Sequence, residues 1–180
     1  MKPLFILLSL FVVTGSTKEQ SNLIRATNSN RPDKHDTLTS NDFTFHGYHI
    51  YDSLSPEEFS RLRKTANSIK YDTGTNYYED EFGLYFKKSV IWFYYKSTHI
   101  NSFELHDNSF AFVVKGKQIK IGEDITPVKH MFPISYAQKY PFSSDNKDTL
   151  VNVHIGDYES LLFYIRSNKI KCIEYWVDNS

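Results

Sequence analysis

The sequence predicts an α+β protein made of two tandem units, each with one short helix and an antiparallel sheet. Short runs rich in aromatic and β-branched residues, which are typical of strands, fill most of residues 42–180. Only two segments show the spacing of an amphipathic helix. Similar stretches also recur after about 70 residues, which indicates an internal repeat.

Charge and composition exclude several classes of protein. The chain has 180 residues, with 21 basic and 21 acidic side chains and a formal net charge of zero. A strongly basic nucleic-acid binder is therefore not expected, and nucleic acid is not an expected partner. Aromatic residues make up 16% of the chain, whereas disordered proteins contain few of them.

Residues 1–16 are typical of an export signal. Lys2 is followed by an apolar segment at 3–13, which is too short for a membrane-spanning helix of roughly 20 residues. The mature chain is therefore expected to have no transmembrane span. Its expected location is the periplasm, the cell envelope or the extracellular medium.

The junction after this segment resembles the lipobox of bacterial lipoproteins, but Ser16 stands where the lipidated Cys would be. Without a thiol at this position a lipid anchor cannot form, so cleavage near residues 15–17 should release a soluble protein. The pattern is either a departure from a lipoprotein signal or a coincidence. Residues 17–41 are rich in Ser, Thr and Asn and predict a disordered polar tether.

The repeat divides the rest of the chain into units 42–109 and 110–180. The two units end with residues 91–105 and 161–175, which align without gaps at an offset of 70. Five pairs are identical there: Phe93/Phe163, Tyr94/Tyr164, Ser97/Ser167, Ile100/Ile170 and Glu104/Glu174. The starts of the units correspond as well, with 45–50 similar to 114–119 at an offset of 69.

The first unit should begin with a strand over 43–50 and continue with a helix. Ser55 as N-cap, Pro56 at the first helical position and Glu58 two residues later form a capping box. An apolar stripe follows at Phe59, Leu62, Ala66 and Ile69. Strands are then expected over 82–86, 89–95 and 99–105, with a turn at Ser97-Thr98.

The second unit should repeat this order, from a strand within 110–121. Thr126 is the expected helix cap and Pro127 the first helical residue, and Pro133 should end the helix early. Strands are expected over 149–156, 160–165 and 169–177, with a turn at Ser167-Asn168. Each unit is thus predicted to be β-α-β-β-β.

The two helix starts, Ser53-Leu54-Ser55-Pro56-Glu57-Glu58-Phe59 and Gly122-Glu123-Asp124-Ile125-Thr126-Pro127-Val128, resemble those of a known group. The chain resembles the tandem α+β proteins of the β-lactamase-inhibitor-protein type, and the small lipoprotein of the outer-membrane β-barrel assembly machinery has a related single unit. The resemblance implies protein binding without catalysis. This chain lacks the disulfides of the secreted inhibitor and has no Gly before its first helix, so no site residues are transferred.

The cysteine and histidines do not predict a catalytic or metal site. The single thiol, Cys172, lies in an alternating apolar run and is expected to be a small buried side chain, since a nucleophile would need a nearby His and a polar cleft. His46 and His49 fall on opposite faces of a predicted strand. The other candidate ligands, His99, His106 and His154, are scattered along the sequence.

Two groups of carboxylates are candidates for a calcium site or an acid–base pair. The triplet Glu79-Asp80-Glu81 shows no calcium-loop spacing and is expected to be a solvated strand end. Glu104 and Glu174 occupy equivalent positions of the repeat, and two carboxylates can act as general acid and base. Apolar neighbours on both sides place each on the polar face of its strand, where solvent exposure is expected.

The surplus of aromatic residues is the strongest functional signal. Trp92, Tyr94, Tyr164 and Trp176 lie in strands that are bulky on both faces, so one face must pack on the other unit or remain available for binding. The sequence predicts an exported, non-catalytic protein-binding module of the bacterial envelope, of the inhibitor or assembly-factor type. The alternative is a small-ligand or glycan-binding protein with an aromatic cleft between the units. No enzyme activity, metal or cofactor is expected.

Overall fold

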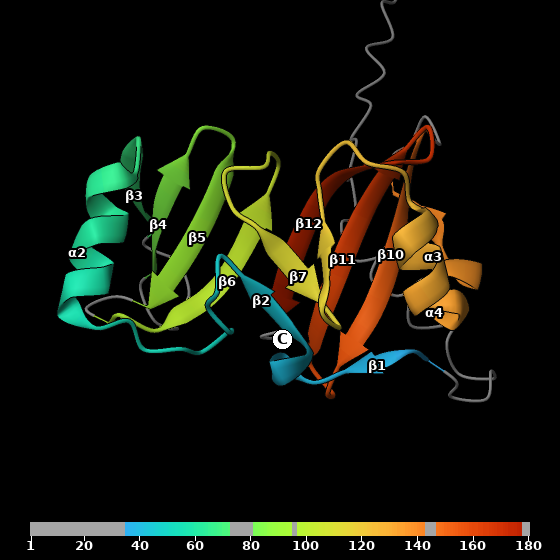
Figure 1. Cartoon of the computed structure of the whole chain (residues 1–180), viewed down its shortest axis with the longest axis horizontal. Coiled ribbons are helices and arrows are strands. Elements are labelled where there is room, and N and C mark those ends of the chain that lie inside the picture. Colours follow the sequence, from blue (N-terminus) through green and yellow to red (C-terminus); the bar gives the residue numbers. More distant parts are fainter. Residues whose placement is uncertain (1–34, 73–80, 95–96, 143–146, 178–180) are drawn as a thin grey trace, which may run out of the picture. The chain divides into compact units, whose positions relative to one another are not determined.

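The computed structural model describes residues 35–72, 81–94, 97–142 and 147–177, all within a unit that begins at His35. The export signal predicted for 1–16, residues 17–34 of the predicted tether, and Glu79 and Asp80 lie outside the described residues. The predicted α+β class is confirmed, since the fold is mostly antiparallel sheet with few helices (Figure 1).

A nine-stranded sheet forms the main layer. Its strand order is β1-β10-β11-β12-β6-β5-β4-β3, with β9 also paired to β10. The bounds are β1 Thr37–Leu38, β3 Ser68–Asp72, β4 Glu81–Phe86, β5 Ser89–Tyr94, β6 Ile100–Leu105, β9 Tyr140–Pro141, β10 Asp148–Ile155, β11 Glu159–Arg166 and β12 Lys169–Val177. All these pairings are antiparallel except that of β1 with β10.

The second layer covers one face of this sheet. It contains a three-stranded sheet of β2 Phe43–Phe45, β7 Phe112–Val114 and β8 Lys117–Ile119, with α2 Pro56–Thr65 near one end and α3 Thr126–Met131 and α4 Pro133–Ala137 near the other (Figure 1). A short 3-10 helix, η1 Ser40–Asp42, precedes β2. The side chains between the layers form one core, in which Phe43, Phe103, Phe112 and Tyr175 meet.

The first predicted helix forms for the predicted reason. The Ser55 hydroxyl accepts from the Glu58 N–H at 3.2 Å, and the Glu58 carboxylate accepts from the Ser55 N–H at 2.9 Å. The apolar stripe was extended too far, because α2 ends at Thr65 and Ile69 belongs to β3. Asn67 fixes this end, since its N–H donates to the Tyr85 carbonyl of β4 at 2.7 Å.

The predicted first strands of both units are shorter than expected. His46 and Gly47 both have positive φ, so the chain turns after Phe45 and does not continue to residue 50. Lys115 and Gly116 do the same, which makes 112–119 a hairpin where one strand was predicted. Positive φ at both central residues matches the two-residue turn that suits strand twist.

The second unit has two helices where one was predicted. Pro133 ends α3 but also starts α4, because its fixed φ and missing N–H suit a first helical position. The cap of α3 also differs from the prediction: Ile125 is the N-cap, and the Asp124 carboxylate accepts from the Thr126 N–H at 2.8 Å. Strands β1, β3 and β9 were not predicted.

The folded unit begins before residue 42, where the predicted tether ends. Thr37–Leu38 pairs with β10, and the Leu38 side chain is buried. The Asp36 carboxylate also accepts from the Ser135 N–H of α4 at 2.7 Å. In the described part of the chain, no helix combines the length and the apolar character needed to span a membrane.

The central strands of the two predicted units lie side by side. Strand β12 pairs with β6 so that Glu174 faces Glu104, and Ile173 and Tyr175 face Leu105 and Phe103. The outer hairpins differ in register, since Ile91 of β5 faces Phe103 whereas Phe163 of β11 faces Ile173. The gapless alignment therefore does not hold between β5 and β11, because β5 is shifted by two residues along its neighbour β6 relative to β11 along β12.

Candidate functional site

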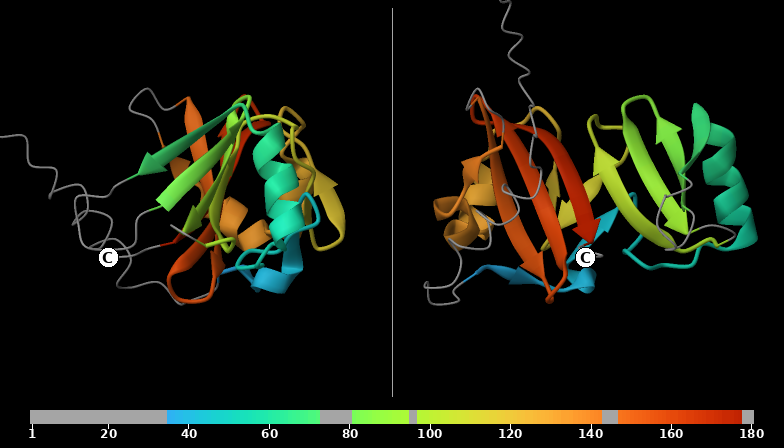
Figure 2. Two further views of the ribbon diagram at one scale, coloured as in Figure 1. Left: turned by 90° about the vertical axis from the view of Figure 1, so that its left-hand side faces the viewer. Right: turned by 180° about the vertical axis from the view of Figure 1, so that it is seen from behind.

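The four predicted aromatic residues all point to one face of the nine-stranded sheet. We call it the outer face, because it lies opposite the small sheet and the helices (Figure 2). Alternation along the strands places Phe93, Phe163 and Tyr175 in the core, so their neighbours Tyr94, Tyr164 and Trp176 point outward. Trp92 also points outward, opposite Gly83 and Ser102. Trp176 is 44% exposed and the other three are half-buried.

Gly83 explains how Trp92 lies on this face. A Cβ atom at residue 83 would come within 3.0 Å of both the Trp92 ring and the Val90 side chain. The missing side chain therefore leaves room for the indole over β4. The Tyr85 ring also contacts the indole, with its centroid 6.0 Å from that of Trp92 in an edge-to-face arrangement.

Glu104 and Glu174 are brought together at the centre of the outer face, which corrects the expectation of two separate, exposed positions. They are direct partners across β6 and β12, where neighbouring side chains come close. Glu104 is 40% exposed and Glu174 is half-buried. Two carboxylates on facing positions repel each other unless one is protonated or a cation intervenes.

A cleft of about 460 Å³ opens beside this pair. Its lining is Glu104, His106, Phe142, Asp148, Tyr164, Arg166, Lys171, Cys172 and Glu174. The Phe142 and Tyr164 rings form an aromatic wall, with their centroids 4.8 Å apart. The Arg166 guanidinium donates to the Asp148 carboxylate at 2.6 and 2.5 Å, so these two opposite charges are matched within the cleft.

Burial and like charge dominate the electrostatics of the cleft. Burial raises the pKa of Glu174, and the Glu104 charge raises it further, although a hydrogen bond donated by Tyr164 at 2.6 Å opposes the shift. The pKa of Tyr164 is also raised, first by burial and then by its bond to Glu174. The site therefore favours neutral forms and disfavours added negative charge.

Cys172 is buried as predicted, but its surroundings differ from the expectation. Its Sγ lies 3.8 Å from Nε2 of His106, at the wall of a polar cleft. Burial and the charges of Glu174 and Glu104 raise the pKa of the thiol well above its ordinary value. Since the thiolate is the reactive form, this neighbourhood suppresses nucleophilic chemistry even though a histidine is close.

Five of the other histidines make contacts within the fold, and His46 lies 5.4 Å from the Phe110 ring. The His49 ring contacts the Ser40 carbonyl at 3.2 Å, and the His99 ring contacts the hydroxyls of Ser53 and Ser97, each at 2.7 Å. The His154 ring lies 4.6 Å from that of His35. No group of three metal-ligating side chains is found in the described ranges.

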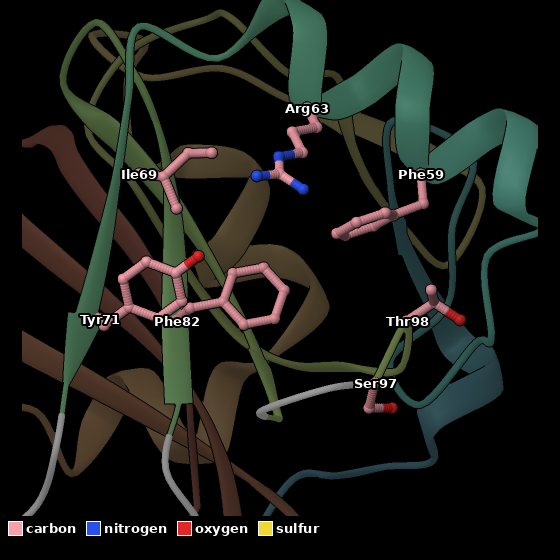
Figure 3. Close-up of a pocket in the computed structure, with 7 residues that line it drawn as sticks. All are labelled: Phe59, Arg63, Ile69, Tyr71, Phe82, Ser97 and Thr98. Carbon is pink, nitrogen blue, oxygen red and sulfur yellow. The ribbon is translucent and has the colours of Figure 1, made fainter.

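A second hollow, of about 320 Å³, lies on the other side of the sheet, between α2 and strands β3 and β4 (Figure 3). Phe59, Arg63, Ile69, Tyr71, Phe82, Ser97 and Thr98 line it. Sequence reasoning assigned Phe59 to the core and gave no role to Arg63. The spacing of these two residues by one helical turn was the signal that could have placed them on the same face of α2.

Comparisons with protein-family models, with curated proteins and with solved structures find no match to this chain. The case for a function therefore depends on the geometry of the two faces.

Proposed function

We propose that this chain is an exported, non-catalytic protein-binding module of the bacterial envelope, and that it binds its partner with the outer face. The observation that carries the proposal is the placement of Trp92, Tyr94, Tyr164 and Trp176 on the sheet face opposite the helices. Tyr and Trp are enriched in protein interfaces because they bury a large area at low entropic cost. The apolar start of the chain supports export.

The polarity of the outer face fits a protein partner. Glu104, Glu174 and the Arg166–Asp148 pair lie among the aromatic residues, so apolar and hydrogen-bonding groups alternate across the surface. Protein interfaces combine aromatic side chains with hydrogen-bonding groups, and the outer face offers both. Burial raises the pKa of Cys172, so the proposal assigns no nucleophilic role to this thiol.

The predicted tandem organisation is part of the proposal. The pairs between β6 and β12 are reciprocal. Glu104 faces its own repeat equivalent, Glu174. Phe103 faces Tyr175, and their repeat equivalents Ile173 and Leu105 face each other. The same reciprocity holds between β2 and β7, where Thr44 faces Val113. Two related units joined by an approximate twofold axis produce such reciprocal pairs. This organisation also agrees with the resemblance to tandem α+β inhibitors.

The alternative is a small polar ligand, such as a glycan, bound in the cleft beside the carboxylate pair. The cleft volume falls within the range of small-molecule sites. Its aromatic wall of Phe142 and Tyr164 could stack on a sugar ring, and Glu104 and Glu174 could accept hydrogen bonds from hydroxyl groups. The cleft draws residues from both predicted units, as the alternative requires.

A capture experiment tests the proposal. The chain is immobilised, exposed to envelope extract of the source cell, and the bound proteins are identified and quantified. Trp176→Ala removes an exposed outer-face ring, and Tyr158→Ala is the control, since Tyr158 is a 68% exposed aromatic in the β10–β11 turn.

We expect one stoichiometric partner that is lost with Trp176→Ala and kept with Tyr158→Ala, both variants being folded by circular dichroism. A partner captured equally by both variants would contradict an outer-face interface. If no protein is captured, a glycan screen with Glu174→Gln as the negative variant decides for or against the alternative.

A further inference from the structure

We propose that the hollow under α2 is a second binding site, for a small carboxylic acid with an apolar ring or tail. The site lies on the opposite side of the sheet from the outer face, so it is separate from the proposed protein-binding surface. It is formed by α2, β3, β4 and the segment that leads into β6 (Figure 3).

Four of the side chains that line this hollow are apolar or aromatic: Phe59, Ile69, Tyr71 and Phe82. Phe82 is buried, and its ring stacks on that of Phe93 at 5.3 Å with an interplanar angle of 12°. Phe59 meets both rings edge-on, at 6.0 and 5.4 Å. Tyr71 lies 6.0 Å from Phe82 and is itself 60% exposed, so it forms the outer edge of the hollow. Such a surface accepts a hydrocarbon ring or chain.

Arg63 brings a single positive charge to these walls. Figure 3 shows its guanidinium directed from α2 into the space between Ile69 and Phe59. Within the described ranges, no hydrogen bond or ion pair to this guanidinium is found. The helix itself offers no acid, because Phe59 and Ser60 precede Arg63 by four and three residues, and Ala66 and Asn67 follow at the same distances.

The chemistry of this lining defines the ligand. A guanidinium pairs with a carboxylate through two parallel hydrogen bonds. Arg63 is exposed to solvent, so such a pair forms at the open edge of the hollow. Phosphate would satisfy Arg63 but would leave Phe59 and Ile69 without an apolar partner. A hydrocarbon alone would leave the charge unpaired. A monocarboxylate with an apolar body satisfies both parts, and the volume of about 320 Å³ suits a small molecule.

The test uses 4-phenylbutyrate as the probe, titrated into the full chain by calorimetry and by amide chemical-shift mapping. Its neutral amide, 4-phenylbutyramide, has the same apolar body without the charge. Arg63→Gln removes the cation, and Arg61→Gln is the matched control, because Arg61 is exposed on the same helix and does not line the hollow. Thermal unfolding verifies that both variants are folded.

We expect the dissociation constant for 4-phenylbutyrate to rise roughly tenfold or more with Arg63→Gln, which is the size of a charge-assisted hydrogen bond. Arg61→Gln should change this constant less than twofold. The neutral amide should bind the unmodified chain no more tightly than the acid binds Arg63→Gln. Shifts should centre on Ile69 and Phe82. No saturable binding at millimolar probe, or equal binding by both variants, would overturn the proposal. Trp176→Ala should leave probe binding unchanged, so this site and the outer face can fail independently.

Discussion

At each end of the core a phenylalanine from the helical layer packs on a phenylalanine of the large sheet, but the two residues from the helical layer differ in burial. At one end Phe59 of α2 packs on Phe93 of β5 at 5.4 Å, and at the other Phe132 packs on Phe163 of β11 at 6.1 Å. Phe132 is completely buried, because α4 begins directly after it and continues against β10. Phe59 is half-buried, because it lines the hollow under the uninterrupted helix α2. The break between α3 and α4 thus accompanies a fully buried Phe132, whereas Phe59 of the unbroken α2 lies beside an open hollow.

The largest expected difference is between Phe132→Ala and Phe59→Ala. Removing a fully buried phenyl ring should lower the free energy of unfolding by about 3–5 kcal/mol. Phe59→Ala should cost roughly half as much, since water already reaches part of this ring. Urea denaturation followed by far-UV circular dichroism measures both. Equal losses would mean that water is excluded equally from Phe59 and Phe132.

The outer face should also respond unequally in its two halves. Gly83→Ala places a methyl group within 3.0 Å of Trp92 and Val90. We expect it to lower the free energy of unfolding by about 1–3 kcal/mol. The residue that faces Leu162 in the other half is Asn152, so no equivalent glycine exists there. Trp92→Leu in the Gly83→Ala background should recover part of the loss. Additive losses would show that Trp92 is not the group displaced.

The helix caps give a smaller contrast. Ser55→Ala should destabilise by about 1 kcal/mol, because the Glu58 N–H loses its acceptor. Asp124→Ala removes the acceptor of the Thr126 N–H, and α3 is only six residues long. We therefore expect Ser55→Ala to reduce helical ellipticity more than Asp124→Ala. Hydrogen exchange at Glu58 and Thr126 provides the site-specific measurement, and the opposite order would contradict it.

The smallest expected effect on stability is that of Glu174→Gln, and its size depends on pH. The folded state raises the pKa of Glu174 above its ordinary value of 4.5, so the folded protein holds this proton more tightly than the unfolded chain. The stabilisation is complete below pH 4.5 and is lost as the pH rises through the folded pKa. The Gln variant should lack this decline in stability.

Glu104→Gln provides the companion to that measurement. Removing the neighbouring charge should lower the pKa of Glu174 and reduce the decline, because the Glu104 charge is one of the causes of the shift. Denaturation midpoints between pH 4 and 8 would compare the three proteins. A decline as steep in Glu104→Gln as in the wild type would show that the two carboxylates do not interact, and a flat wild-type curve would show that the pKa of Glu174 is not raised.

Local signals in the sequence were read correctly where the cause is local. The capping box at Ser55 and Glu58, the turn at Ser167-Asn168 and strand β12 over 169–177 all form as predicted. The predictions were wrong where a residue distant in the sequence determines whether a segment forms a strand. Residues 68–72 became a strand because β4 offers an edge, and the positive φ at His46 and Lys115 ended two predicted strands early.

The candidate sites show the same division. The surplus of aromatic residues singled out Trp92, Tyr94, Tyr164 and Trp176, and the repeat singled out Glu104 and Glu174. That the two glutamates face each other depends on the pairing of β6 with β12, which no local pattern encodes. The approach of His106 to Cys172, 66 residues apart, depends on the same pairing.

The sequence by itself determined the class of fold, the first helix and most of the long strands, because these follow from caps, turns and side-chain alternation over a few residues. The tertiary structure alone decided which strands are neighbours, and with that the carboxylate pair, the cleft beside it and the hollow under Arg63. These features join residues far apart in the chain, and their geometry is set by how the strands and helices pack into one shared core.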